Sequence, residues 1–277
     1  MENSHLILLS GSDMQETVSG ELVHSRLGGM LVRVDAQRKT PGLSESDVVR
    51  LHPNQLEQLY YQLPASRRVC TVVVSANAVP ATLEFLEQHQ GTVSDFASVI
   101  CTTTPNASSQ QSVADRLPRL SRMGVDQSQL GVLFTQAPRT ATVDEAYGHL
   151  VAFIRDNFPR ISLEAVLHHS SIFTRIRELQ LPVATVLRGE VDYKAALEQA
   201  HKNCEPEDVL NQLARQLMMQ RARSGWKAES SRALNTLRVP DLFERNRQPP
   251  VLTEGALLLP QAPVATEEIM SEQTTGS

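Results

Sequence analysis

The stretch that decides the fold is residues 5–17, HLILLSGSDMQET. Residues 6–9 form a short apolar run without a polar face, which is typical of a strand buried on both sides in a parallel sheet. The run ends at Ser10-Gly11, and an amphipathic helical pattern follows over residues 18–27. A buried strand that turns directly into such a helix predicts the first β-α unit of an α/β domain.

Short apolar runs and helical patterns continue to alternate as far as about residue 190, which predicts repeated β-α-β units. The expected strands are residues 6–9, 30–34, 71–74, 98–102, 131–135 and 163–167, with a weaker one at 183–187. The expected helices are 18–27, 53–60, 79–89, 108–123 (kinked at Pro118), 143–158, and a short one capped by Ser170 or Ser171. The predicted fold is a doubly wound α/β domain with a mainly parallel sheet.

The strand pattern stops after about residue 190. Helical patterns follow at 192–203 and again after Pro206, where one apolar stripe comprises Val209, Leu210, Leu213, Leu217 and Met218. From Asn246 the chain becomes aperiodic and rich in Pro, Thr, Glu and Gln, a composition typical of disorder. We therefore expect an α/β domain over 1–190, a helical extension over 191–245 and a disordered tail over 246–277.

Composition favours a cytoplasmic globular protein. The net charge of -5 argues against nucleic-acid or membrane binding by the chain as a whole. Its three cysteines form no close pair, and the odd number argues against a disulfide framework. The sequence shows neither a signal peptide nor an apolar run long enough to span a membrane.

The first strand-to-helix turn is where a phosphate-binding loop would begin. Such a loop needs glycines, so that backbone N–H groups can close around the phosphates, and a lysine to neutralise them. Here a glutamate, Glu16, stands where the lysine would be, and the first lysine of the chain is Lys39. The scaffold suits a nucleotide site, but the residues that perform the chemistry are replaced.

The order of these segments resembles the ParA/MinD-type deviant P-loop ATPases, most closely the StbB-like plasmid stability and partition proteins. The likeness covers about residues 5–200 and is one of pattern. It rests on residues 6–11, on Val32-Arg33-Val34-Asp35, on residues 72–80, on 99–136 with Thr104-Pro105 and Met123-Gly124-Val125, on Phe158-Pro159-Arg160, and on Val191-Asp192-Tyr193.

The departures from that family are as informative as the matches. The family's loop reads lysine-glycine-glycine-valine-glycine-lysine-serine/threonine, whereas this chain has residues 12–16 replaced and keeps the hydroxyl of Thr17. An acid beside a phosphate costs about 4 kcal/mol at ~4 Å, and Asp13 and Glu16 would both lie there. The aspartate that ends the family's third strand and organises magnesium corresponds to Val73.

The resemblance therefore implies degenerate nucleotide-binding motifs, in which Gly11, Ser12, Thr17 and Asp35 are the vestigial nucleotide-binding positions. We expect no catalytic residue and no metal ligand. For Asp35 and Thr17 the alternative is an ordinary turn residue and an ordinary residue in the first turn of a helix.

One segment carries a local excess of positive charge. Residues 215–247 hold eight basic residues against three acids, together with the only tryptophan. The candidate partner-binding residues are Arg215, Arg221, Arg223, Trp226 and Lys227. A charged element of this kind suits a polyanion or a membrane surface, and the alternative is a solvated helix face.

Together these features predict a non-catalytic ParA/StbB-like protein. It would act as a binding or scaffolding module in plasmid or mobile-element maintenance or transfer, with a protein partner and no cofactor. One alternative is an active partition-type ATPase, using ATP and magnesium, that a partner subunit completes. Another is an accessory protein that binds DNA through residues 215–247. A homodimer is compatible with each of these alternatives.

Overall fold

The computed structural model describes residues 5–11, 13–36, 48–63, 69–89, 91–170, 172, 183 and 191–239; for 13–17, 62, 223 and 224 it describes the backbone alone. The chain divides into two compact units, Met1–Arg245 and Asn246–Ser277, and all described residues belong to the first. The predicted disordered tail, the strand predicted at 183–187 and most of the short helix predicted after Ser171 lie outside the described residues.

A seven-stranded sheet forms the centre of the first unit, with the strand order β3-β2-β4-β1-β5-β6-β7. Each of its pairings is parallel. The strands are β1 His5–Leu9, β2 Met30–Val34, β3 Val48–Leu51, β4 Cys70–Val74, β5 Phe96–Thr103, β6 Leu130–Ala137 and β7 Val166–His168. This sheet confirms the predicted α/β fold class.

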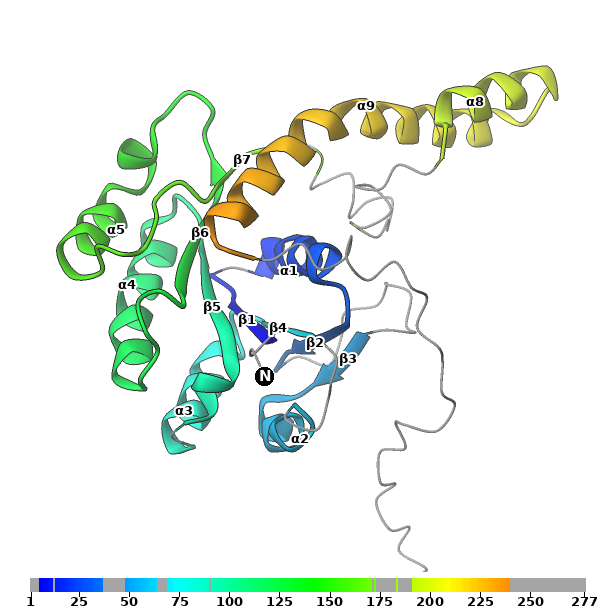
Figure 1. The fold of residues 1–277 in the computed structure, drawn as a ribbon. Helices are drawn as coiled ribbons and strands as arrows, with labels where there is room; N and C mark the ends of the chain where they lie inside the picture. The colour runs from blue at the N-terminus through cyan, green and yellow to red at the C-terminus, as the bar shows by residue number, and fades with distance from the viewer. Residues whose placement is uncertain are drawn as a thin grey trace, which may run out of the picture. The chain divides into compact units, whose positions relative to one another are not determined.

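Helices cover both faces of the sheet (Figure 1). They are α1 Asp13–Leu27, α2 Leu56–Gln62, α3 Val79–Gln88, α4 Ala107–Arg122, α5 Val143–Asn157, α8 Tyr193–Lys202 and α9 Glu207–Thr236, with 3-10 turns at Pro53–Gln55 and Thr92–Asp95. Helices α2 to α5 lie on one face, and α1 lies on the other together with the C-terminal half of α9.

The alternation of side chains along β1 shows how the two core layers form. Ile7 and Leu9 belong to the hydrophobic cluster beneath α2 to α5, whereas Leu6 and Leu8 belong to the cluster beneath α1 and α9. All four side chains are at most 3 % exposed. A strand buried on both faces is the arrangement that its continuous apolar sequence predicts.

Polar side chains mark where several helices begin. Asn106 accepts a hydrogen bond from the backbone of Ser108 at the start of α4. Thr142 and Glu145 form a reciprocal capping box at the start of α5, and Asp192 caps α8. These bonds satisfy backbone N–H groups that the first turn of a helix leaves without partners.

Two local features differ from the sequence predictions. Strand β3, a four-residue edge strand that is partly exposed along its length, was not predicted. The last described strand begins at Val166 rather than at residue 163, because the backbone N–H of Val166 bonds the carbonyl of Glu164 and so closes a tight turn over residues 164–166. Helix α4, by contrast, agrees with the predicted helix over 108–123, since it runs from Ala107 to Arg122 with Pro118 inside it.

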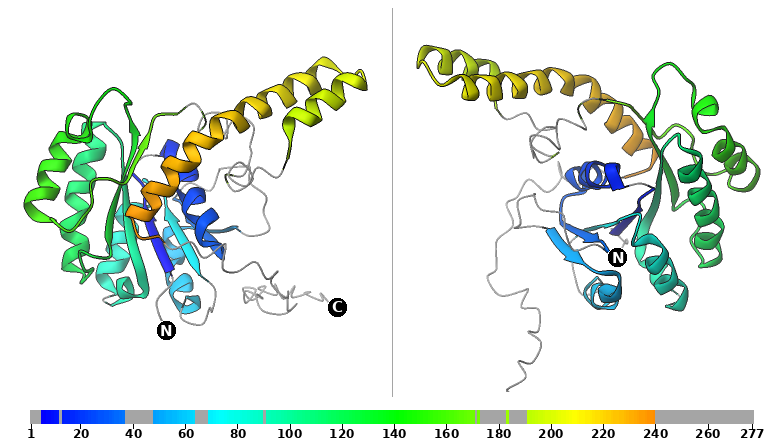
Figure 2. Two further views of the ribbon diagram at one scale, coloured as in Figure 1. Left: turned by 45° about the horizontal axis from the view of Figure 1, so that its top comes forward. Right: turned by 180° about the vertical axis from the view of Figure 1, so that it is seen from behind.

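The predicted helical extension consists of two different parts. Helix α8 and the first half of α9 pack on each other as a hairpin, and no residue of α9 before Met219 is buried (Figures 1 and 2). Beyond that point α9 lies on the sheet, and Met219, Trp226, Ala233, Leu234 and Leu237 are buried in the α1-side core. The second half of α9 is therefore part of the α/β domain.

Two of the three cysteines should not react in the native protein. Cys70 and Cys101 are buried, and burial raises the pKa of their thiols to about 12 and about 11. Cys204 is exposed. We expect a thiol reagent at pH 8 to label one cysteine per native chain and three per unfolded chain. Labelling of two or three in the native state would contradict the described packing.

Candidate functional site

The carboxyl end of β1 is the place in this fold where a ligand site is expected. Helix α1, which follows β1, lies on one face of the sheet, while α3 and α4, which follow β4 and β5, lie on the other. Open parallel sheets bind ligands outside the carboxyl ends of strands where the connections diverge in this way. The candidate site is therefore bounded by the residues that follow β1, β4 and β5.

The predicted site residues are only partly brought together. Gly11 follows β1, and the backbone of Thr17 lies in the second turn of α1. Asp35 follows β2, which is separated from β1 by β4. Ser12 and the side chain of Thr17 lie outside the described part of the chain.

The connection from β1 to α1 is very short. Strand β1 ends at Leu9 and α1 begins at Asp13, so three residues join them. Residues 13–17, which are predicted to correspond to most of a phosphate loop, are the first residues of α1. A phosphate loop encloses its ligand with several consecutive backbone N–H groups of an irregular segment. A three-residue connection does not supply that segment.

Gly11 has a packing role at this turn. Its N–H donates to Thr102 Oγ1 at 3.0 Å. A Cβ added at Gly11 would lie 2.3 Å from the carbonyl oxygen of Thr102 and 2.9 Å from Ser109 Oγ. The close approach of β1 to the end of β5 therefore requires glycine here. This packing explains the glycine even if no phosphate binds at the turn.

The hydroxyl groups at the ends of β5 and β6 bond to neighbouring protein groups. Ser109 Oγ accepts a hydrogen bond from the backbone of Thr104 at 3.1 Å and lies 3.4 Å from Thr103 Oγ1. Thr135 Oγ1 donates to the carbonyl of Thr103 at 2.7 Å. In this part of the described structure Ser10 Oγ is the buried hydroxyl without a hydrogen-bond partner. Apart from Ser10, the hydroxyl groups described here thus already have hydrogen-bond partners within the protein.

Arg116 of α4 is a member of the site that the sequence analysis missed. It is 8 % exposed and donates to the carbonyl of Ser10 and to Ser112 Oγ, both at 2.8 Å. Burial lowers the pKa of its guanidinium from the usual value. The sequence pattern that could have identified Arg116 is its position on the apolar side of α4, three residues after Val113 and four before Leu120. Its bond to Ser10 ties the end of β1 to α4.

Asp35 belongs to a polar cluster formed by the residues that directly follow β2 and β4. Asn77 Nδ2 donates to Asp35 Oδ1 at 3.1 Å. The Ser75 hydroxyl lies 2.9 Å from the carbonyl oxygen of Val34 and 2.5 Å from Asn77 Oδ1. These hydrogen bonds agree with the alternative interpretation of Asp35, in which it is a turn residue at the end of a strand.

Val73, which is predicted to correspond to a magnesium-organising acid, lies in the core. It is 1 % exposed and belongs to the α1-side cluster. A Cβ added at Gly20 of α1 would lie 2.5 Å from Val73 Cγ2, so the helix packs tightly on this side chain. Among the described residues no group of His, Cys, Asp and Glu could hold a metal ion.

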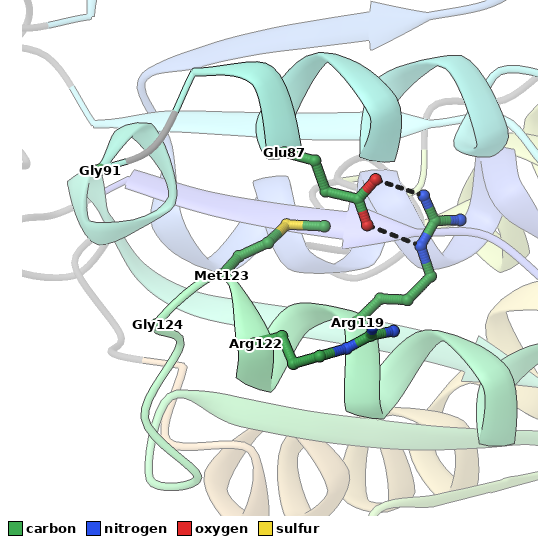
Figure 3. A pocket seen from close by; sticks show the side chains of 6 residues that line it. All are labelled: Glu87, Gly91, Arg119, Arg122, Met123 and Gly124. Atoms are coloured by element: carbon green, nitrogen blue, oxygen red, sulfur yellow. Dashed lines mark hydrogen bonds and ion pairs between the residues drawn. The ribbon is translucent and has the colours of Figure 1, made fainter.

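A separate hollow of about 490 Å³ lies between the ends of α3 and α4 (Figure 3). The hollow is lined by residues at the C-terminal ends of these helices. It therefore lies toward the amino ends of the strands, whereas the candidate site lies at their carboxyl ends. Arg119 faces Glu87 across it and donates two hydrogen bonds of 2.9 Å. The guanidinium is thus already paired, and the arrangement is that of an interhelical ion pair.

The candidate partner-binding residues do not form one surface. Trp226 is 3 % exposed and packs inside the α1-side core. Arg215, Arg221 and Lys227 are exposed, but each is six residues from the next, which turns the helix by about 240°. They therefore point to three sides of α9. The side chain of Arg223 lies outside the described residues.

Comparison of the sequence with protein-family models and with curated proteins gives no match. Comparison of the structure with solved structures finds several similar chains. A ParA family ATPase from Chlorobium tepidum is 11 % identical, with a TM-score of 0.42, over 68 % of this chain and 92 % of its own. An McdA–ATP complex from Cyanothece is 10 % identical, with a TM-score of 0.41, over 67 % and 90 %. MinD from Aquifex aeolicus is 12 % identical, with a TM-score of 0.44, over 78 % and 96 %.

In the part of the chain that the structure describes, no helix is both long and apolar enough to cross a membrane.

Proposed function

We propose that this protein is a non-catalytic relative of the ParA/MinD-type ATPases. It would serve in the cytoplasm as a binding or scaffolding module in plasmid or mobile-element maintenance or transfer. The observation that carries the proposal is the three-residue connection between Leu9 and Asp13, which leaves no segment to enclose a triphosphate. The biological setting comes from the resemblance of the sequence to StbB-like proteins.

Two further observations support the loss of catalysis. Val73 occupies the position of the magnesium-organising acid and is packed against Gly20 of α1. The N–H of Gly11, which a phosphate loop would direct at its ligand, donates to Thr102 instead. Regaining activity would require changes at several separate positions, because loop, lysine and acid are independent parts of the site.

In this proposal the protein acts by binding another protein through its surface. An ATPase completed by a partner subunit would have to unwind the first turns of α1 to make room for phosphates. An accessory protein that binds DNA would need phosphate contacts along one surface, whereas Arg215, Arg221 and Lys227 point to three sides of α9. The geometry therefore favours a protein partner over both alternatives.

The Glu16→Lys variant tests the proposal by restoring the lysine of a phosphate loop. It returns the lysine to its position but leaves the connection at three residues, so we expect neither ATP hydrolysis nor nucleotide binding. Phosphate release and titration with a fluorescent ATP analogue, both with magnesium, measure this. Glu16→Gln is the matched control, since it removes the acid without adding a base. Magnesium-dependent hydrolysis by Glu16→Lys alone would favour the ATPase alternative.

A further inference from the structure

Three faces of α9 can be distinguished by what they contact. Trp226 is buried on the face that packs on the sheet. Gln220 marks a second face, since its side chain donates to the carbonyl of Val191, just before α8. At about 100° per residue, Ala214 lies about 120° from each of these side chains. The third face, around Ala214, is therefore turned away from the sheet and from Val191, and it borders the half-buried side of α9 around Leu213.

This third face carries an apolar stripe with a charge at each end. The stripe, which we call the Ala214 face, consists of Glu207, Leu210, Ala214, Leu217, Met218 and Arg221. Met218 is 50 % exposed and is one of the few large apolar side chains of the described structure on the surface. Leu210, Ala214 and Leu217 are half-buried, and both end charges are exposed.

Four residues of the Ala214 face are placed symmetrically about Ala214, whereas Leu217 has Asn211 at the equivalent position. Ala214 lies seven residues after Glu207 and seven before Arg221, and four residues after Leu210 and four before Met218. When a second α9 is laid antiparallel with the two Ala214 residues opposite each other, Glu207 of each copy meets Arg221 of the other. Leu210 then meets Met218 on both sides of the crossing point. An interface related by a two-fold axis requires this self-complementary pattern.

We propose that the Ala214 face is a dimerisation surface whose partner is the α9 helix of a second copy of this chain, packed antiparallel. The small side chain of Ala214 at the crossing point allows the two helix backbones to approach closely. The apolar neighbours remove surface from water, and the end charges select the antiparallel orientation. Arg221 also interacts within its own chain, but a guanidinium has five donors and can bind a second carboxylate.

The dimer is expected to be weak and independent of nucleotide. Two helices that contact along four turns bury less than the ~1,600 Å² of a standard interface, which places the contact among the transient ones. We therefore expect a dissociation constant of about 10 µM or weaker. Sedimentation velocity between 1 and 200 µM, without ATP, would follow the change from the mass of one chain to that of two.

Charge reversal tests the antiparallel pairing. Because each pair occurs twice in a two-fold dimer, Glu207→Lys or Arg221→Glu alone should weaken association about tenfold. The double variant Glu207→Lys/Arg221→Glu should restore it to within about threefold of the wild type, because both pairs are re-formed with exchanged signs. A double variant as weak as the sum of the single ones would overturn the pairing.

Cysteine cross-linking tests the position of the two-fold axis. In a Cys204→Ser background, Ala214→Cys should form an intermolecular disulfide under mild oxidation, because the two copies of residue 214 face each other. Gln212→Cys is the matched control, since residue 212 is exposed but lies about 160° away from the Ala214 face. Equal cross-linking of both variants, or a monomer at 200 µM with no cross-link, would overturn the proposal. Unchanged circular dichroism of the variants would confirm that they are folded.

Discussion

Replacing Gly11 by alanine should destabilise the protein by about 3 kcal/mol. The added methyl group would lie 2.3 Å from the carbonyl oxygen of Thr102, and a backbone atom cannot move aside as a flexible side chain can. To relieve this overlap, β1 and β5 must separate at the position where Gly11 donates to Thr102 Oγ1. Urea unfolding followed by circular dichroism measures the loss in the free energy of unfolding.

The matched control is Gly225→Ala in α9. A Cβ at Gly225 meets nothing within 4 Å, so the same change of glycine to alanine should stabilise the helix by about 1 kcal/mol. The two substitutions thus have opposite expected signs. If Gly11→Ala left the free energy of unfolding unchanged, the packing role assigned to Gly11 would be wrong.

Replacing Trp226 by alanine should cost about 4 kcal/mol, the usual range for a large buried aromatic side chain. Trp226 is 3 % exposed and belongs to the same cluster as Leu22 of α1 and Leu133 of β6. Without the indole ring, the second half of α9 loses a large buried side chain from the α1-side core. Urea unfolding measures the loss, and limited proteolysis shows whether α9 has detached.

Tyr61→Ala is the matched control for this substitution. Tyr61 is also aromatic but is 73 % exposed, so its loss should change the free energy of unfolding by no more than about 0.5 kcal/mol. A Trp226→Ala protein as stable as the wild type would mean that the second half of α9 does not pack on the sheet. It would then be an extension separate from the α/β domain, as the sequence analysis expected.

The sheet could be predicted from the sequence wherever a strand is buried on both faces. Strands β1, β2 and β4 differ from their predicted ranges by at most one residue, because each is a short and mainly apolar run. Strand β3 could not be found in this way. It has four residues at the edge of the sheet, and a strand that is partly exposed carries no such run.

The candidate site was less predictable because its contacts join distant parts of the chain. The replacement of the loop lysine by Glu16 can be read from the sequence. The apolar pattern of α4 can also be read there, but the bond that explains Arg116 goes to Ser10, 106 residues away. In α9 the helical pattern can be read from the sequence, whereas its two neighbours, α8 beside the first half and the sheet beside the second, depend on tertiary packing.

The most direct test of the central claim is a calorimetric titration of the wild-type protein with magnesium-ATP. The claim is that the turn after β1 no longer encloses a triphosphate, because three residues join Leu9 to Asp13. The account predicts no saturable heat up to about 1 mM nucleotide, which corresponds to a binding free energy weaker than about -4 kcal/mol. A magnesium-dependent dissociation constant in the low micromolar range would contradict it.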